Sequence, residues 1–120
     1  MSARILVADD SQSMLRIILR SLQAVGVPGA VTVADGDEAI RRFKPGEFDL
    51  VMTDWSMPGK TGLEVTAAIR RQDPQVPIIL VTTEAERWRV HEAGEVGVSD
   101  YLVKPFTSAK LQEKLAKHGC

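Results

Sequence analysis

The sequence predicts an α/β fold built on a parallel β-sheet, and two observations support this prediction. First, five short apolar runs, most of them rich in Val, Ile and Leu, recur along the 120 residues, at 5–8, 30–34, 50–53, 78–82 and 101–103. Their period-2 alternation is weak, which is typical of strands covered on both faces, as in a parallel sheet. Second, a segment with helical signals follows each run. Such β–α alternation favours a parallel sheet with right-handed crossovers.

The first two helices have clear sequence signals. Asp35 and Glu38 have the spacing of a capping box and open a helix that runs through Phe43. The helix before it is indicated by apolar residues on one face, and it should end at the turn residues 26–29. The side chains expected on that face are Met14, Ile17, Ile18, Leu22 and Val25.

The last three helices are indicated mainly by caps and helix breakers. A third helix is expected at about 62–72, just before an Asp-Pro pair. A fourth should lie within 85–93, although its apolar pattern is poor and Gly94 weakens its end. A fifth begins after Thr107, a residue that suits the N-cap position, and ends near Lys117.

Length and composition favour an ordinary globular domain and argue against several classes of function. A chain of 120 residues suits one domain, so residues 1–120 are expected to form a single unit. The formal net charge of -1 gives no basic surface for nucleic acid or for a membrane. The N-terminus lacks a long apolar segment, and the single cysteine, Cys120, fits a reducing compartment. We therefore expect a cytoplasmic protein.

Charged and polar side chains stand at the ends of four predicted strands. Asp9 and Asp10 follow the first strand, Asp54 ends the third, Thr82 ends the fourth and Lys104 follows the fifth. Ligand sites in open parallel sheets lie at the carboxyl ends of the strands. We therefore expect these five side chains to gather at one edge of the sheet.

Three clustered carboxylates suit a site for Mg²⁺ and a phosphoryl group. Neighbouring carboxylates repel one another, and a hard divalent cation with oxygen ligands relieves that repulsion. An aspartate can act as a nucleophile and form an aspartyl phosphate, with Lys104 and Thr82 placed to bind the phosphoryl oxygens. Strands disfavour aspartate, so a reactive role would explain Asp54. The plain alternative is that each aspartate only forms a turn or caps a helix.

The motifs around these residues resemble those of response-regulator receiver domains. The resemblance covers nearly the whole chain and rests on LVADDS, TDWSMPGKTGLE, VTTEA and YLVKPF, at the first, third, fourth and fifth strands. It implies a flavodoxin-like (βα)5 three-layer sandwich with the strand order 2-1-3-4-5. Within that family the chain is most similar to the stand-alone chemotaxis regulators.

The resemblance implies a role for each residue of the site. Asp54 matches the phosphoacceptor, and Lys104 matches the lysine that pairs with the phosphoryl group. Asp9 and Asp10 match the acidic pair that binds Mg²⁺, with Asp10 favoured as the direct ligand. The backbone carbonyl of Ser56 would be a further ligand.

The resemblance also implies a switch beside the site. Thr82 matches a switch hydroxyl, and Tyr101 matches the aromatic residue that turns inward when that hydroxyl moves. The peptide between Lys104 and Pro105 is expected to be cis.

The chain also departs from the family pattern near the acceptor. Thr61 replaces a residue that is usually acidic, and Lys60 adds a positive charge. Trp55 is expected to be partly exposed and to shield the loop. Trp88 is expected to pack against the domain, with a partner contact as the alternative.

The function implied by the resemblance is that of a response regulator in a two-component system. A histidine kinase of the CheA type would phosphorylate Asp54, and the chain would then change its affinity for a partner such as the flagellar motor switch. Its only catalysis would be its own phosphorylation and dephosphorylation.

Three alternatives stay open. The chain could be a phosphorelay intermediate that passes its phosphoryl group to a histidine phosphotransfer protein. A phosphatase of the haloacid dehalogenase type is disfavoured, because Asp9 and Asp10 are adjacent and the nucleophile candidate lies on the third strand. A flavodoxin-like binding module is disfavoured too, because the carboxylates would repel a nucleotide phosphate.

Overall fold

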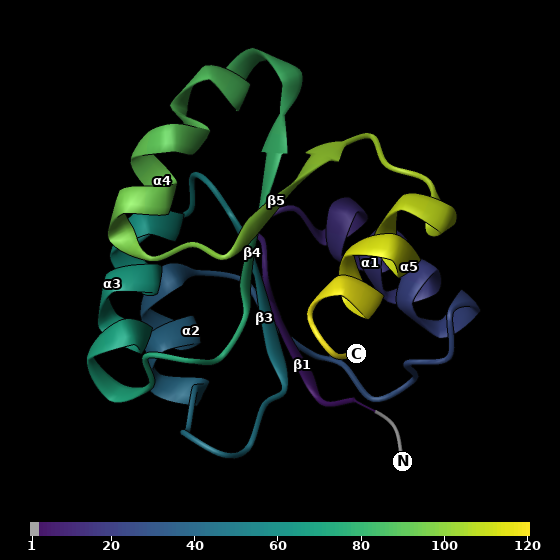
Figure 1. The fold of residues 1–120 in the computed structure, drawn as a ribbon, viewed down its shortest axis with the longest axis horizontal. Coiled ribbons are helices and arrows are strands. Elements are labelled where there is room, and N and C mark those ends of the chain that lie inside the picture. The colour runs from purple at the N-terminus through teal and green to yellow at the C-terminus, as the bar shows by residue number, and fades with distance from the viewer. Residues whose placement is uncertain (1–2) are drawn as a thin grey trace.

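The computed structural model describes residues 3–120, and it shows a sheet with helices on both faces (Figure 1). In chain order the elements are β1 (Ile5–Ala8), α1 (Gln12–Ala24), β2 (Val31–Val33), α2 (Gly36–Arg42), β3 (Leu50–Asp54), α3 (Gly62–Gln72), β4 (Ile78–Thr83), the 3₁₀ helix η1 (Glu84–Arg89), α4 (Val90–Val96), β5 (Asp100–Lys104) and α5 (Ser108–Lys117). The five strands are parallel and lie in the order β2-β1-β3-β4-β5. The predicted fold class and strand order are therefore confirmed.

The helices form two layers around the sheet. Helices α1 and α5 cover one face, and α2, α3 and α4 cover the other (Figure 1). Because both faces are covered, the strands need apolar side chains on both sides, which explains their weak alternation. Leu50, Val51 and Met52 of β3 are all fully buried, although successive side chains point to opposite faces.

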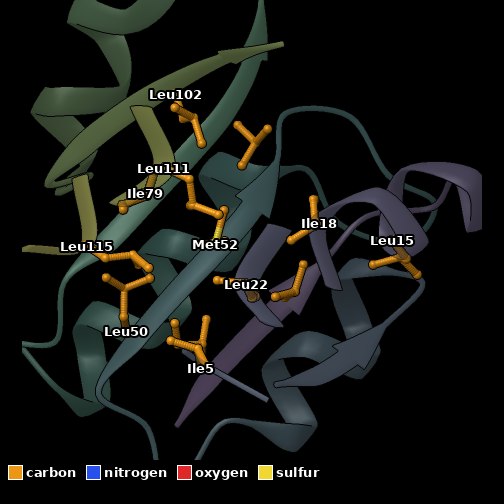
Figure 2. Packing of buried hydrophobic residues seen from close by; sticks show 13 residues of the cluster. Ile5, Leu15, Ile18, Leu22, Leu50, Met52, Ile79, Leu102, Leu111 and Leu115 are labelled. Carbon is orange, nitrogen blue, oxygen red and sulfur yellow. The ribbon is translucent and has the colours of Figure 1, made fainter. Parts of the chain in front are cut away.

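The core beneath α1 and α5 contains most of the large aliphatic side chains. Figure 2 shows Leu22 of α1 and Leu115 of α5 meeting side chains of β1 and β3, among them Ile5 and Leu50. The expectation for Ile17 was wrong, because its side chain is 48% exposed while its neighbour Ile18 is buried. A helix buries a stripe, and the stripe of α1 is centred on residues 15, 18 and 22.

Side-chain caps fix where four of the helices begin. Ser11, Asp35, Thr61 and Thr107 each accept a hydrogen bond from the backbone N–H three residues further on, which satisfies a donor at the helix start. The caps at Asp35 and Thr107 were predicted. No helix within residues 3–120 is long and apolar enough to cross a membrane.

The fourth predicted helix differs from the observed one. The segment after β4 first forms η1, and α4 starts only at Val90. The side chain of Glu86 accepts hydrogen bonds from the backbone N–H and hydroxyl of Thr83, which closes a tight first turn. Helix α4 ends at Val96, and the next residue, Gly97, has a φ of 117°, in the left-handed region that glycine tolerates.

Candidate functional site

The carboxylates predicted at the strand ends converge in the structure. Oxygen atoms of Asp9, Asp10 and Asp54 all lie within 4.8 Å of one another. The sheet topology explains this, because β1 and β3 are neighbours and Ala8 lies opposite Thr53. Asp9 is buried, Asp54 is partly buried and Asp10 is exposed. The cluster is therefore open to solvent on one side.

Within residues 3–120, Lys104 is the only lysine whose ammonium group bonds to this cluster. Its Nζ lies 3.2 Å from Oδ1 of Asp54 and 3.4 Å from Oδ2 of Asp9. All three of these side chains are largely shielded from solvent. One cation thus binds two acidic side chains, which leaves the cluster with an excess of negative charge.

The electrostatic environment perturbs both members of the central ion pair. Burial, and then the neighbouring charge of Asp9, raise the pKa of the Asp54 carboxyl group, and the opposing effect of Lys104 is smaller. Burial also works against the Lys104 ammonium, but Asp54 and Asp9 outweigh it and raise the pKa of Lys104. The site is thus one in which added positive charge would be favourable.

The loop after Asp54 folds back tightly on the acceptor strand. The backbone N–H of Trp55 donates to Oδ1 of Asp54 at 2.8 Å, and the carbonyl of Trp55 accepts from the N–H of Gly62 at 2.8 Å. A Cβ atom on Gly62 would collide with the carbonyl oxygen of Asp54 and crowd Leu80. Glycine is therefore required where α3 begins, and the two bonds of Trp55 fix the orientation of the carboxylate.

The two residues that depart from the family pattern make local contacts in the structure. Thr61 and Glu64 form a reciprocal capping box at the start of α3, a role that needs a side-chain acceptor at position 61. Lys60 forms an ion pair with Asp37 of α2 at 3.8 Å, and both side chains are exposed. Such a pair is worth little in stability.

Thr82 and Tyr101 lie on the neighbouring strands β4 and β5. The hydroxyl of Thr82 is fully buried and donates to the carbonyl of Thr83 at 3.3 Å. The ring of Tyr101 is half-buried, and its centre lies 6.0 Å from the guanidinium carbon of Arg87 and 5.1 Å from Nζ of Lys114. Thr82 thus lies near the end of β4, and the ring of Tyr101 lies close to the cationic groups of Arg87 and Lys114.

The remaining predicted features have mixed outcomes. The peptide between Lys104 and Pro105 is cis, as expected. Ser56 lies in the loop after Trp55 with an exposed side chain. Trp88 is 79% exposed, so the expectation that it packs against the domain was wrong, and the alternative of a partner contact stays a prediction.

The expected partial exposure of Trp55 was also wrong, and part of the reason is a residue that the sequence did not single out. Trp55 is only 2% exposed, because its ring packs with Leu80 and Ala93 and the guanidinium carbon of Arg89 lies 4.2 Å from the ring centre. A second missed group surrounds Asp100 at the start of β5, where Lys114 of α5 and His118, which follows α5, converge. Neither contact follows a spacing or motif, so only the fold reveals them.

A five-stranded parallel sheet with three carboxylates and a lysine at the ends of β1, β3 and β5 defines a receiver-type domain. The sequence model of the response regulator receiver domain matches residues 5–116, and the chain belongs to this family.

The chain is also similar to individual chemotaxis regulators. It is 40% identical to the chemotaxis protein CheY-3 of Vibrio cholerae over 116 residues, which cover 95% of this chain and 89% of that protein. The solved structure of the chemotaxis response regulator CheY4 of Vibrio cholerae superposes with a TM-score of 0.88 at 34% identity, over 98% of this chain and 99% of the other.

A third similar structure is the receiver domain of the sensor histidine kinase PA1611 of Pseudomonas aeruginosa. It superposes with a TM-score of 0.89 at 31% identity and covers 100% of both chains. That structure has a magnesium ion coordinated in its active site cleft. The chain is thus a receiver domain of a CheY-like response regulator.

Proposed function

We propose that residues 1–120 act as one receiver domain in the cytoplasm, which accepts a phosphoryl group on Asp54 from a histidine kinase of the CheA type. The observation that carries this proposal is the ion pair of Lys104 with Asp54 and Asp9, beside the third carboxylate of Asp10. A partly buried nucleophile with a cation in contact supplies the positioning and charge neutralisation that phosphoryl transfer requires.

The hydrogen bonds of Asp54 support the proposal that its Oδ2 atom is the one that reacts. Oδ1 accepts hydrogen bonds from the N–H of Trp55 and from Lys104, whereas Oδ2 has no hydrogen bond within residues 3–120. In the proposed step Oδ2 attacks phosphorus, a new P–O bond forms, and the bond from phosphorus to the donor breaks with its electron pair leaving on the donor. Lys104 remains in place to bind a phosphoryl oxygen.

The acidic cluster fits Mg²⁺. Three carboxylates with oxygens within 4.8 Å of one another form a hard-oxygen donor set, and their negative charge exceeds that of the single lysine. Asp9, Asp10 and Asp54 would hold the ion, together with the backbone carbonyl of Ser56. When bound, the ion supplies positive charge to the phosphoryl oxygens.

We expect the protein to gain one phosphoryl group when it is incubated with acetyl phosphate and Mg²⁺. Without a divalent cation, the carboxylates would repel the anionic donor, so EDTA should suppress the gain by about a hundredfold or more. Intact-mass spectrometry of samples with Mg²⁺ and with EDTA measures this. The proposal fails if no phosphoryl group is gained, or if EDTA leaves the gain unchanged.

We further propose that phosphorylation changes a partner-binding groove through Thr82 and Tyr101. A groove of about 460 Å³ lies between η1, β5 and α5, with Tyr101 on its wall. The cationic side chains of Arg87, Lys110 and Lys114 line it, beside apolar ones such as Phe106. It suits a protein segment with acidic and apolar side chains, and by resemblance the partner is the flagellar motor switch.

Replacing Thr82 with alanine tests the switch. The variant should still be phosphorylated, within about tenfold of the wild-type rate, because Thr82 supplies only one of the groups that bind the phosphoryl oxygens. It should lose the phosphorylation-dependent change in the amide NMR signal of Tyr101. Thr66→Ala is the matched control, because Thr66 is also buried and also donates its hydroxyl to a backbone carbonyl. An unchanged Tyr101 response in Thr82→Ala would contradict this role.

A further inference from the structure

A contact between Arg89 and Trp55 joins the segment after β4 to the acceptor loop. The guanidinium carbon of Arg89 lies 4.2 Å from the centre of the Trp55 ring, well within the range of a cation–π interaction. Trp55 is 2% exposed, and the Arg89 side chain that covers it is 34% exposed. The stack is thus largely withdrawn from water, where this type of interaction is strongest.

The other contacts of Arg89 are weaker than this stack. Its Nε lies 3.8 Å from a carboxylate oxygen of Glu92, and the Glu92 side chain is more than half exposed. The ring of Trp88 lies 5.9 Å from the guanidinium carbon, and that ring is 79% exposed. Exposed pairs of this kind contribute little. The position of Arg89 is therefore set mainly by Trp55.

Trp55 in turn orients the carboxylate of Asp54. Its backbone N–H donates to Oδ1 at 2.8 Å, and its carbonyl accepts the N–H of Gly62 at 2.8 Å. Any rotation of the Trp55 backbone moves the donor that fixes Oδ1 and so changes the direction in which Oδ2 points. An indole held between the core and a guanidinium cannot rotate freely, because its packing partners Leu80 and Ala93 are fully buried.

We propose that Arg89 is a positioning residue for phosphoryl transfer to Asp54. It acts through Trp55, whose ring it stacks on and whose backbone N–H holds the acceptor carboxylate in its reactive orientation. This inference rests on the proposed phosphoacceptor function of Asp54. The positioning residue would thus lie in the 3₁₀ helix η1, outside the acidic cluster.

The rate of phosphorylation by acetyl phosphate at saturating Mg²⁺ tests this role. In Arg89→Ala the maximal rate should fall about threefold to tenfold, because small losses of orientation are costly to a reacting group. The acetyl phosphate concentration at half the maximal rate should stay within about twofold of wild type. Arg89→Lys, which keeps a cation but not the flat stacking surface, should give an intermediate rate.

Arg42→Ala is the matched control. Arg42 also lies over an aromatic ring, 5.6 Å from the centre of Phe48, and also pairs with a glutamate, Glu47. Phe48 precedes β3, so this contact lies at the edge of the sheet opposite to Asp54. Arg42→Ala should keep the wild-type rate, and all variants are compared below their unfolding temperatures.

Fluorescence of Trp55 provides a second readout. The chain has two tryptophans, so Trp88→Phe leaves Trp55 as the single indole. In that background Arg89→Ala should shift the Trp55 emission to the red and increase its quenching by acrylamide, because the ring becomes exposed. An unchanged emission would show that Arg89 does not cover Trp55 and would overturn the proposal.

Three kinetic outcomes would also overturn it. Equal rates in wild type and Arg89→Ala would do so, as would an equal loss in Arg42→Ala. A raised half-saturating concentration with an unchanged maximal rate would mean that Arg89 attracts the anionic donor instead of positioning Asp54. If the wild type itself gained no phosphoryl group, the phosphoacceptor function would fail first, which distinguishes the two failures.

Discussion

Replacing Asp54 with asparagine is expected to reduce phosphoryl incorporation from acetyl phosphate to an undetectable level. The amide nearly matches the shape of the carboxylate, but its oxygen is a far poorer nucleophile, so no aspartyl phosphate can form there. Asp9 cannot take over the reaction, because it is buried and bonded to Lys104 and to the N–H of Ser11. Intact-mass spectrometry with Mg²⁺ present measures the loss.

Asp73→Asn is the control for that substitution. Asp73 lies before β4, at the opposite edge of the sheet, and one carboxylate oxygen accepts the N–H groups of Gln75 and Val76. Asparagine keeps an oxygen that can accept both bonds, so Asp73→Asn should be phosphorylated as the wild type is. Persistent phosphorylation of Asp54→Asn would place the acceptor on another residue and would contradict the proposed role of Asp54.

The location of the site could be predicted because it depends on topology and on local sequence. Each residue of the cluster stands at the end of a strand, and the strands are marked by apolar runs that a parallel sheet must bury on both faces. Once the strands are parallel, Asp9 and Asp54 must share an edge, and Lys104 must lie at that same edge. Side chains that are next to strand ends are therefore placed by the sheet itself.

The contacts around the site could not be predicted, because they depend on how long side chains cross between elements. Arg89 and Trp55 lie on separate segments, and Arg89 is the last residue of η1. The weak apolar pattern of residues 85–93 gave no sign of the turn that starts η1, and the helix predicted there begins at Val90 instead. Short turns are set by side-chain bonds such as that of Glu86 to Thr83, which periodicity does not detect.

Asp100, at the start of β5, is expected to make the strongest single electrostatic contribution to the stability of the fold outside the acidic cluster. The side chain of Asp100 is 6% exposed, and its carboxylate is bonded by Lys114 at 2.8 Å, by His118 at 2.9 Å and by the N–H of Tyr101 at 2.8 Å. Lys117 adds a longer ion pair at 3.4 Å. These contacts tie the last turns of α5 to the sheet.

Asp100→Asn should lower the free energy of unfolding at pH 7 by about 3 kcal/mol, because it leaves the largely buried ammonium of Lys114 without its counter-ion. Burial disfavours the Asp100 carboxylate, but hydrogen bonds from Lys114 and His118 outweigh burial and hold its pKa well below the usual range. A lowered native pKa gives stability that is complete above the unfolded pKa of about 4 and is lost as the pH falls further. The difference between wild type and variant should therefore narrow below about pH 4.

Urea unfolding followed by circular dichroism, at pH 7 and at steps below pH 5, measures both effects. Glu113→Gln is the matched control, because Glu113 also pairs with a lysine of α5, Lys110 at 3.3 Å, but both side chains are exposed. That variant should change stability by less than about 0.5 kcal/mol, as exposed pairs of this spacing do. If Asp100→Asn cost no more than Glu113→Gln, the ion pairs at the start of β5 would not be what holds α5 to the sheet. A difference that stayed constant down to pH 3 would contradict the lowered pKa of Asp100.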